Sequence, residues 1–455
     1  MGRRLIVVGA GAAGMSAASA ARRVDEELSI LVLEAGQHAA YGLCGLPYFL
    51  SQVVPEVDSL RAYPPDFFRD KRGIEIRFGA EVVRIDPERQ IVHVRIDGDI
   101  EQLAYNRLVL TAGARPVLPP IPGLDDDHVF AIRTVEGSIR LRRLLDAGHI
   151  GHATVIGGGY IGLEVTESLA ERGVSVTVVE ALPHLMPNLD PEFSAKVEEE
   201  VTRHADCKLN TAVKEVTRTN DGLQVGLCDS KAFRTDAVIV ATGVRPASVL
   251  GEMIGAETGP AGALIVDDRM RTSVPNVLAA GDCIAPNHVV TGSPAFVPLG
   301  PTANKTGRVA GTVAAGGDAN FPGVVGTAVV KVFGVGVART GLTLSEALDA
   351  GYEAYATDAT GRSRAKYYPG SAPVEVRLVH TADGRLLGAQ FAGSGDDVAK
   401  RVDVAAVALH AAFSVQDLTE LDLSYAPPFA PVYEPLLLAA ASAASAMRRR
   451  METVA

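Results

Sequence analysis

The sequence predicts an α/β fold in which one strand–turn–helix–strand unit occurs twice, followed by a smaller α+β region. The glycine-rich turn of this unit reads GAGAAG at residues 9–14 and GGGYIG at 157–162, each between a β-branched strand and a helix. In both copies the second strand ends at an acidic residue, Glu34 or Glu180. This order is the context in which a glycine-rich turn binds a dinucleotide. The alternating strands beyond about residue 325 contain no such turn and indicate a different kind of domain.

The chain has 455 residues, which is too long for one ordinary hydrophobic core. We expect two Rossmann-like dinucleotide-binding domains and a C-terminal α+β domain. The first dinucleotide-binding domain comprises residues 1–115 and 247–324. The second comprises residues 116–246, and the α+β domain comprises residues 325–455.

Composition narrows the possible partners. The net charge of −11 comes without the basic clusters that binding to a phosphate backbone requires, so we expect no nucleic-acid partner. The apolar stretch 436–447 is shorter than the ~20 residues of a membrane span and is predicted to be a packed terminal helix. The four cysteines are widely scattered and form no metal-ligand pair, which fits a reducing cytoplasm.

The three glycines of the first turn have separate roles in binding a dinucleotide. Gly9 makes the tight turn, Gly11 lets a pyrophosphate approach the backbone, and Gly14 lets the helix pack closely on the strand. Glu34 is expected to accept hydrogen bonds from a ribose; the alternative is a structural turn before an ordinary helix. In the second copy, Glu180 would repel a 2′-phosphate, which favours NADH over NADPH. The alternative for Glu180 is a solvated carboxylate at a strand end.

Two further segments resemble each other, namely YNRLVLTAGARP at 105–116 and FRTDAVIVATGVRP at 233–246. Each ends a buried strand in a turn of small residues, which lets backbone approach a ligand. Gly281 and Asp282 follow a third such strand.

Cys44 lies in the segment YGLCGLPY, shortly after Glu34. Pro47 and Phe49 occupy the positions at which a CxxC or CxxxxC partner would stand, so no local redox disulfide can form. A reactive Cys44 would have to pair with a small thiol or become a sulfenic acid or persulfide. A thiolate there would be stabilised by the positive end of a helix or by a flavin. The alternative is a buried structural cysteine.

The segment CGLPY, the two glycine turns, the AGD turn at 280–282 and YAPPF at 425–429 together resemble the single-cysteine branch of the pyridine nucleotide-disulfide oxidoreductases. The resemblance covers essentially the whole chain and is strongest to coenzyme A disulfide reductases. It implies that NAD(P)H passes electrons through FAD to Cys44 and on to a low-molecular-weight disulfide or persulfide.

The resemblance also implies a set of site residues. It places FAD against Gly9, Gly11, Ala13, Gly14, Glu34, Thr111, Ala112, Gly113, Arg133, Gly281, Asp282, Pro298, Leu299 and Ala303. It places the nicotinamide nucleotide, NADH with NADPH as the other possibility, against Gly157, Gly159, Tyr160, Ile161, Gly162, Glu164, Glu180 and Gly243. The substrate would be held by Arg22, Arg23, Arg72 and Asn304.

Two tyrosines of the last domain, Tyr367 and Tyr425, resemble those that serve the cysteine of a partner subunit. A phenol can donate a proton to a departing thiolate, so the resemblance implies that both act as catalytic residues of a homodimer. The alternative is that they are interface packing residues. Within the second glycine turn, Tyr160 would be an aromatic gate over the flavin or, alternatively, a residue that packs on the sheet.

The chain departs from the coenzyme A disulfide reductase pattern just before the cysteine. Ala40 and Leu43 replace the Ser and Asn expected to hydrogen-bond the pantetheine, which puts coenzyme A specificity in doubt. NADH oxidases and peroxidases of the branch that this chain resembles carry a histidine at the position of Ala10 or Ala12. This chain has none there, so the resemblance disfavours a peroxide- or oxygen-reducing role. Two alternatives stay open: an NADH oxidase or peroxidase that works through a Cys44 sulfenic acid, and an electron-transfer flavoprotein that serves a protein partner.

Overall fold

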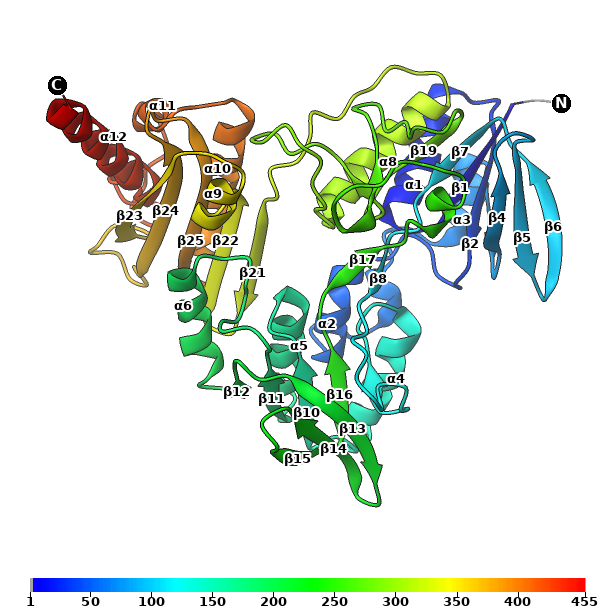
Figure 1. Cartoon of the computed structure of the whole chain (residues 1–455), viewed down its shortest axis with the longest axis horizontal. Helices are drawn as coiled ribbons and strands as arrows, with labels where there is room; N and C mark the ends of the chain where they lie inside the picture. The colour runs from blue at the N-terminus through cyan, green and yellow to red at the C-terminus, as the bar shows by residue number, and fades with distance from the viewer. Residues whose placement is uncertain (1–2, 455) are drawn as a thin grey trace.

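The computed structural model describes residues 3–454 and contains three large sheets (Figure 1). The first sheet is wholly parallel, with the order β19-β7-β1-β2-β3. Its strands are β1 (Arg4–Val8), β2 (Ser29–Glu34), β3 (Ile74–Phe78), β7 (Arg107–Leu110) and β19 (Val277–Ala279). The strands β1, β2, β7 and β19 are rich in Val, Leu and Ile and almost fully buried, as strands covered on both faces must be, whereas the edge strand β3 is largely half-buried.

Helices α1 (Ala12–Val24) and α8 (Gly300–Ala314) pack against each other beside this sheet. A three-stranded antiparallel meander lies next to it, formed by β4 (Glu81–Asp86), β5 (Ile91–Ile96) and β6 (Asp99–Ala104). Short helices α2 (Leu46–Leu50) and α3 (Pro65–Arg72) and the 3₁₀ turns at Leu43–Gly45 and Val57–Leu60 connect β2 to β3. The first glycine turn follows β1, the central strand, and so lies at the carboxyl end of the parallel sheet, where ligands of open parallel sheets bind.

The second sheet repeats the design of the first, in the order β12-β11-β10-β16-β9, and all its pairs are parallel. Its strands are β9 (Val129–Phe130), β10 (His152–Ile156), β11 (Ser175–Val179), β12 (Asp206–Lys208) and β16 (Ala237–Val240). The helices α4 (Val135–Asp146), α5 (Tyr160–Glu171) and α6 (Pro191–Val201) accompany it, with a meander of β13 (Val213–Thr219), β14 (Gly222–Leu227) and β15 (Ala232–Thr235). The internal duplication in the sequence is thus a duplication of structure.

The two similar segments at 105–116 and 233–246 meet in space. Their ends form β8 (Ala114–Pro116) and β17 (Val244–Pro246), which pair in antiparallel register and connect the two parallel-sheet domains. The chain then returns to the first domain through α7 (Val249–Glu252), the 3₁₀ turn Pro260–Gly262, β18 (Leu264–Ile265) and β20 (Ile284–Ala285).

The third sheet is antiparallel, in the order β21-β22-β25-β24-β23. It contains β21 (Ala328–Val332), β22 (Val335–Gly341), β23 (Ala354–Arg362), β24 (Pro373–Thr381) and β25 (Leu386–Ser394). Its helical elements are α9 (Leu344–Asp349), the 3₁₀ turn Gly395–Val398, α10 (Ala399–His410), α11 (Val415–Thr419) and α12 (Pro435–Val454). The predicted apolar terminal helix is α12, and none of the helices among the described residues is long and apolar enough to cross a membrane.

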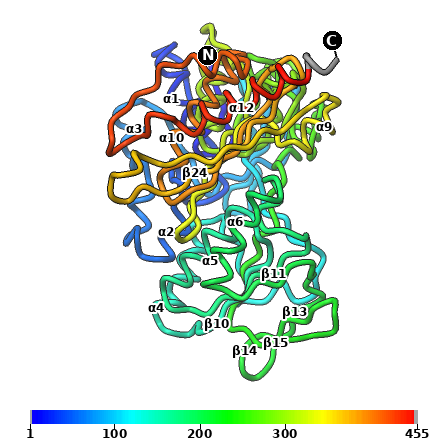
Figure 2. The backbone as a smooth tube through the Cα atoms, turned by 90° about the vertical axis from the view of Figure 1, so that its left-hand side faces the viewer, coloured from blue at the N-terminus to red at the C-terminus, as the bar shows by residue number. Residues whose placement is uncertain are grey.

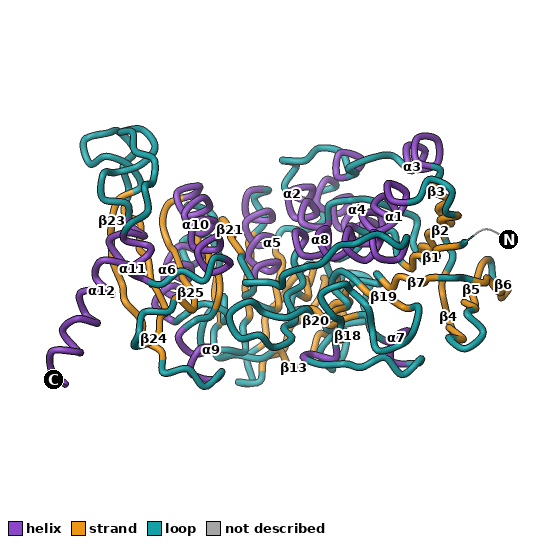
Figure 3. The backbone as a smooth tube through the Cα atoms, turned by 90° about the horizontal axis from the view of Figure 1, so that it is seen from above, coloured by secondary structure: helices purple, strands orange, loops and turns teal. Residues whose placement is uncertain are grey.

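Seen from the side, the second domain projects away from the other two (Figure 2). The first and third sheets lie at opposite ends of the molecule, and the first described residues and α12 are correspondingly far apart (Figure 3). The two Rossmann-like sheets and the C-terminal α+β sheet confirm the predicted fold class.

Candidate active site

The first glycine turn has the geometry that its sequence predicts. Gly9 has φ of +104°, and a Cβ there would lie 2.4 Å from the carbonyl oxygen of Thr111. A Cβ at Gly14 would lie 1.9 Å from the carbonyl oxygen of Gly9, so α1 can approach the turn only with glycine at this position. A Cβ at Gly11 would meet no protein atom within 4 Å, which leaves its side of the turn open to a pyrophosphate.

The second glycine turn repeats these contacts. Gly157 has φ of +108°, and its Cβ would lie 2.5 Å from the carbonyl oxygen of Ala241, while a Cβ at Gly162 would lie 2.1 Å from the carbonyl oxygen of Gly157. Gly159, like Gly11, faces open space. Both turns therefore offer a backbone cradle at the start of a helix, which fits the phosphates of two dinucleotides.

The two acidic strand ends bind their own glycine turns. The carboxylate of Glu34 accepts hydrogen bonds from the amides of Ala10 at 2.7 Å and Gly36 at 2.8 Å. Glu180 accepts in the same way from Gly158 at 2.7 Å and Leu182 at 2.8 Å. Each carboxylate thus shapes the turn, a role the sequence did not reveal. It retains lone pairs with which it can accept from a ribose.

The third strand end lies beside the first glycine turn and α1. Gly281, with φ of +83°, lies so close to α1 that its Cβ would be 2.7 Å from that of Ala13. Asp282 forms an ion pair with Arg133 at 3.1 Å, and Arg133 also donates to the carbonyl of Ala114 at 3.2 Å. The other residues predicted to hold FAD lie around this point, on the turn after β7 and at the start of α8, namely Thr111, Ala112, Gly113, Pro298, Leu299 and Ala303.

Tyr160 is the first residue of α5, followed by Ile161. Its hydroxyl accepts a hydrogen bond from the side-chain amide of Asn188 at 2.7 Å, and burial raises the pKa of the phenol. Gly243, with φ of +99°, faces open space in the turn after β16.

Cys44 lies in the 3₁₀ turn Leu43–Gly45, immediately before α2, and is exposed to solvent. Its pKa is raised by partial burial and by the carboxylates of Glu164 and Asp282, with Arg133 acting in the opposite direction. The polypeptide by itself therefore does not stabilise the thiolate as the sequence led us to expect. The acidic neighbours outweigh the cation, and the helix that follows has only five residues.

Glu164 lies on α5 and hydrogen-bonds Tyr48 of α2, a partner that the sequence did not reveal. Burial raises the pKa of Glu164 to about 7, although the bond from Tyr48 acts in the opposite direction. A protonatable carboxyl group therefore stands beside Cys44 at neutral pH.

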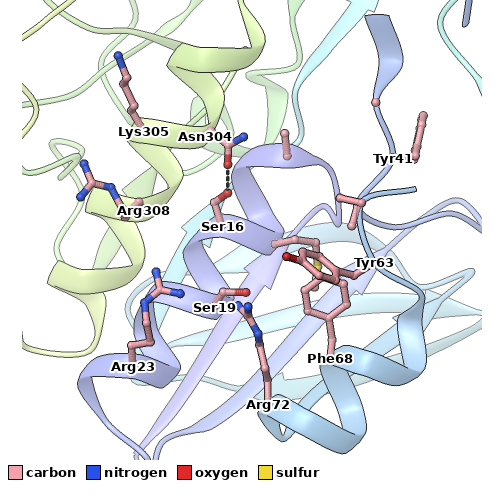
Figure 4. A pocket seen from close by; sticks show the side chains of 15 residues that line it. Ser16, Ser19, Arg23, Tyr41, Tyr63, Phe68, Arg72, Asn304, Lys305 and Arg308 are labelled. Atoms are coloured by element: carbon pink, nitrogen blue, oxygen red, sulfur yellow. Dashed lines mark hydrogen bonds between the residues drawn. The ribbon is translucent and has the colours of Figure 1, made fainter. Parts of the chain in front are cut away.

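A cavity of about 510 Å³ opens between α1, α8 and the segment after β2 (Figure 4). Three of the four predicted substrate residues line it: Arg23, Arg72 and Asn304. Asn304 accepts a hydrogen bond from the hydroxyl of Ser16. The lining also includes Gly42, which stands two residues before Cys44 in the chain.

The fourth predicted substrate residue, Arg22, does not line this cavity. Its guanidinium donates to the carbonyls of Arg72 at 2.9 Å, Gly73 at 3.0 Å, Glu26 at 2.5 Å and Asp25 at 3.2 Å. Adjacent helical residues point in different directions, so Arg23 faces the cavity while Arg22 ties α1 to the end of α3.

The cavity contains further residues that the sequence analysis missed, namely Ser16, Ser19, Tyr63, Phe68, Lys305 and Arg308. The spacing of Ser16, Ser19 and Arg23 on one helix face was an available signal. With Arg23 and Arg72, the two additional cations give the cavity four positive side chains, and its described lining includes no acidic residue. The Arg72 guanidinium lies over an aromatic cluster, 5.1 Å from the Phe67 ring centre and 5.9 Å from that of Phe68.

Tyr367 and Tyr425 lie together on loops of the third domain, with their hydroxyls 3.4 Å apart. They are 75% and 49% exposed, so both phenols are accessible to a second molecule. The contact between the hydroxyls raises the pKa of Tyr425.

Comparison with known proteins decides the family. Residues 3–303 match the pyridine nucleotide-disulphide oxidoreductase family, and residues 327–436 match the dimerisation domain of that family. The chain belongs to the pyridine nucleotide-disulphide oxidoreductases. Membership confirms the resemblance found in the sequence and implies FAD and a nicotinamide nucleotide as cofactors, which the two cradles described above fit.

Two other proteins and one crystal structure illustrate how closely members of the family resemble this chain over nearly its full length. The NAD(P)H coenzyme A polysulfide/persulfide reductase of Pyrococcus horikoshii is 37% identical over 97% of this chain and 98% of its own. The NADH oxidase of Methanocaldococcus jannaschii is 33% identical, again over 97% and 98%. The crystal structure of reduced Bacillus anthracis CoADR-RHD superimposes with a TM-score of 0.95 at 34% identity, covering 98% of this chain and 81% of that one.

Proposed function

We propose that this enzyme uses NAD(P)H to reduce the disulfide or persulfide of a small thiol that carries a phosphorylated nucleotide, coenzyme A or a close analogue. The observation that carries the proposal is the cavity at the Cys44 segment, with its four cations and its aromatic cluster. Coenzyme A carries several phosphates and an adenine ring, which match cationic and aromatic groups respectively. The name of the Pyrococcus horikoshii relative supports the same substrate class.

The missing pantetheine ligands do not argue against this substrate. Ala40 lines the cavity, and its backbone is fixed because its amide donates to the Ala10 carbonyl at 2.9 Å and its carbonyl accepts from Ala62 at 2.8 Å. The neighbouring lining residues, Tyr41, Gly42 and Ala62, form an open and largely apolar wall. We infer that the pantetheine arm is held mainly by shape and apolar contact, and that the cations supply most of the affinity.

The chain's own residues perform the sulfur chemistry. The Cys44 thiolate attacks one sulfur of the substrate disulfide; a new S–S bond forms, the old one breaks, and the second thiol leaves with a proton from Tyr425 of a partner subunit. When bound, FAD supplies the route by which two electrons from the reduced nicotinamide return the mixed disulfide to two thiols. Glu164 holds or releases a proton beside Cys44, since its pKa lies at about 7.

We infer that NADH is the preferred nucleotide. Glu180 lies at the end of β11, where a 2′-phosphate would meet its carboxylate. The nearby His184 pairs with Glu198 at 3.0 Å, so it is not free to neutralise Glu180. The kcat/KM for NADH should therefore exceed that for NADPH by at least about tenfold, which corresponds to ~1.4 kcal/mol.

The test is an anaerobic assay of NADH oxidation and thiol release with coenzyme A disulfide, coenzyme A persulfide, glutathione disulfide and cystine. We expect turnover with the two coenzyme A substrates and its loss in Cys44→Ser. Arg308→Met and Arg23→Met should raise KM for them by about tenfold each, because a charge-assisted contact to phosphate is lost. The control Arg269→Met removes only a surface ion pair with Asp318 and should leave KM unchanged.

The same assay separates the alternatives. Consumption of oxygen or peroxide by the native protein without thiol release would favour the oxidase activity that the Methanocaldococcus jannaschii relative is named for. Full activity of Cys44→Ser with an external redox protein would favour the electron-transfer role. Either result would overturn the disulfide reductase proposal.

A further inference from the structure

The segment that follows Cys44 belongs to the first domain in sequence but packs in the core of the second. Leu46 and Leu50 of α2 are completely buried, and they share a hydrophobic cluster with Leu141 of α4 and Leu163 of α5. Figure 1 shows α2 between these two helices. The position of Cys44 is therefore set by how α2 is docked on the nicotinamide domain.

A five-residue helix does not hold itself in place. Backbone amides just beyond α2 donate to the carbonyls of Pro47 and Phe49, the latter from Gln52 at 3.4 Å, and two arginines of the second domain add side-chain donors at the end of the helix. Arg142 of α4 donates to the carbonyl of Phe49 at 2.5 Å, and Arg172, the residue that ends α5, donates to the carbonyl of Leu50 at 3.1 Å. These contacts are directed at backbone atoms, which fixes the helix itself as well as its side chains.

Both arginines are held by one carboxylate. Asp146 accepts from Arg142 at 2.9 Å and from Arg172 at 2.8 Å, and it also accepts from Gln52 beyond α2 at 3.1 Å. The two arginine side chains are only 14% and 16% exposed. Although burial acts to raise it, the pKa of Asp146 is lowered by the bonds from Arg172 and Arg142, so the carboxylate stays charged near neutral pH.

The middle residue of α2 contacts the same helix α5. Tyr48 hydrogen-bonds Glu164, and Glu164 also acts electrostatically on Cys44. Glu164 and Arg172 are eight residues apart, about two helical turns, so α5 fastens α2 at two separated points. Two such points restrain both rotation and sliding of α2.

We propose that Arg142 and Arg172, held by Asp146, are positioning residues that dock the Cys44 segment on the nicotinamide domain and fix the Cys44 sulfur relative to α5. The proposal rests on the proposed function only in giving Cys44 the reactive role. Loss of one guanidinium removes a hydrogen bond that fastens the end of α2 to the second domain and frees α2 to shift, which weakens the electrostatic contact between Glu164 and Cys44.

The experiment measures that contact directly in the FAD-loaded, thiol-reduced protein. The rate of Cys44 alkylation by iodoacetamide is followed against pH by peptide mass spectrometry, and the midpoint is compared between chains with and without Glu164→Gln. In the otherwise native chain, Glu164→Gln should lower the midpoint by about one pH unit, because it removes a negative charge beside the sulfur. In chains that also carry Arg172→Met or Arg142→Met, Glu164→Gln should lower the alkylation midpoint by less than about half a pH unit.

Arg203→Met is the matched control, because Arg203 is an exposed arginine whose ion-pair partners, Glu199 and Glu200, lie on α6. The full effect of Glu164→Gln should persist in that background. Arg172→Lys keeps the charge but lacks the planar guanidinium that bridges Asp146 and the Leu50 carbonyl. In this background we expect the effect of Glu164→Gln to be intermediate. Because the charge is kept, Arg172→Lys also serves as a second variant that folds. Amide hydrogen exchange over residues 46–52 should increase in the Arg172 and Arg142 variants alone.

An undiminished effect of Glu164→Gln in the folded Arg172→Met and Arg172→Lys chains would overturn the proposal. Alkylation requires no turnover, so this outcome is distinguishable from failure of the disulfide reductase assay.

Discussion

At the scale of single residues, the cysteines differ mainly in access to solvent. Cys44 and Cys228 are exposed, whereas Cys283 is completely buried, with its thiol 3.3 Å from the carbonyl of Ala280 and 3.5 Å from that of Leu110. Burial raises the pKa of Cys283 to about 12. A buried, protonated thiol is unreactive, because only the thiolate is a nucleophile.

We therefore expect iodoacetamide to modify Cys44 and Cys228 in the native protein at pH 8 and to leave Cys283 unmodified. Peptide mapping after a timed reaction measures this, with guanidinium-unfolded protein as the control in which every cysteine reacts. Modification of Cys283 in the folded protein at the rate of Cys228 would contradict the burial and raised pKa of the Cys283 thiol.

A second prediction concerns how Glu164 makes the free energy of unfolding depend on pH. Its folded pKa is about 7, above the ordinary 4.5, so the folded state keeps a proton that the unfolded chain has lost between these values. Stability from this group is thus present below about pH 4.5, falls as pH rises, and is lost above about pH 7. Glu164→Gln carries no charge and should be more stable than the native chain by about 1–3 kcal/mol at pH 8, with little difference at pH 5.

Urea unfolding at both pH values, with equal FAD present, tests the Glu164 prediction. The control is Glu171→Gln, at an exposed position near the end of the same helix. A stability gain for Glu164→Gln that is the same at pH 5 and pH 8 would show that the effect does not come from ionisation.

At the scale of elements, α1 and α8 pack unusually closely beside the first sheet. A Cβ at Gly307 would lie 2.2 Å from the carbonyl oxygen of Ala13, and a Cβ at Gly311 would lie 1.9 Å from that of Ala17. This close approach brings Arg23 of α1 and Arg308 of α8 to the same cavity. The glycines of α8 therefore determine the spacing of the cations.

Gly311→Ala should force the two helices apart. Overpacking of this kind costs about 1–3 kcal/mol, so we expect a lower Tm and, because the cations separate, a higher KM for the coenzyme A substrate. The matched control is Gly300→Ala at the first residue of the same helix, where a Cβ would meet no protein atom within 4 Å, so its Tm should not fall. Unchanged Tm and KM in Gly311→Ala would contradict the close packing.

These same elements show how far the sequence could predict the site. The glycine turns, Glu34, Glu180 and Cys44 were predictable because each lies in a local order of strand, turn and helix that permits few structures. Lys305 and Arg308 were not, because they reach Arg23 only through packing of helices nearly 300 residues apart in the chain. That Arg22 does not line the cavity has a similar origin, since its bonds to the carbonyls of Arg72 and Gly73 join segments about 50 residues apart in the chain.

The docking of α2 was unpredictable for the same reason. In the sequence, Leu46 and Leu50 are ordinary apolar residues that follow the cysteine proposed to react. Nothing local indicates that they pack in the core of the second domain. From the sequence alone, Arg142 and Arg172 would likewise be interpreted as solvated helix residues. Only the structure shows that they donate to the carbonyls of Phe49 and Leu50.

At the scale of the whole molecule, the groups proposed for one catalytic cycle come from different domains of the chain. Cys44 belongs to the segment docked between the two nucleotide-binding domains, and Tyr367 and Tyr425 lie on loops of the third domain. The sheet of that domain lies at the opposite end of the molecule from the first sheet (Figure 1). Residues 327–436 match a dimerisation domain, and the exposed Phe429, Val432 and Tyr433 near Tyr425 are 81%, 65% and 75% exposed. An apolar surface of this kind fits an interface with a second copy.

If each site combines Cys44 of one subunit with Tyr425 of the other, mixed dimers should restore activity. Cys44→Ser and Tyr425→Phe homodimers are each expected to be impaired, the first completely. Random mixing by co-expression at equal levels makes about half of the dimers mixed, and each mixed dimer has one intact site, so about a quarter of native activity should return. Differently tagged subunits allow the mixed dimer to be purified and assayed alone. If Cys44 and Tyr425 acted within one chain, no mixed dimer would contain an intact site, and activity would not exceed the average of the two homodimers.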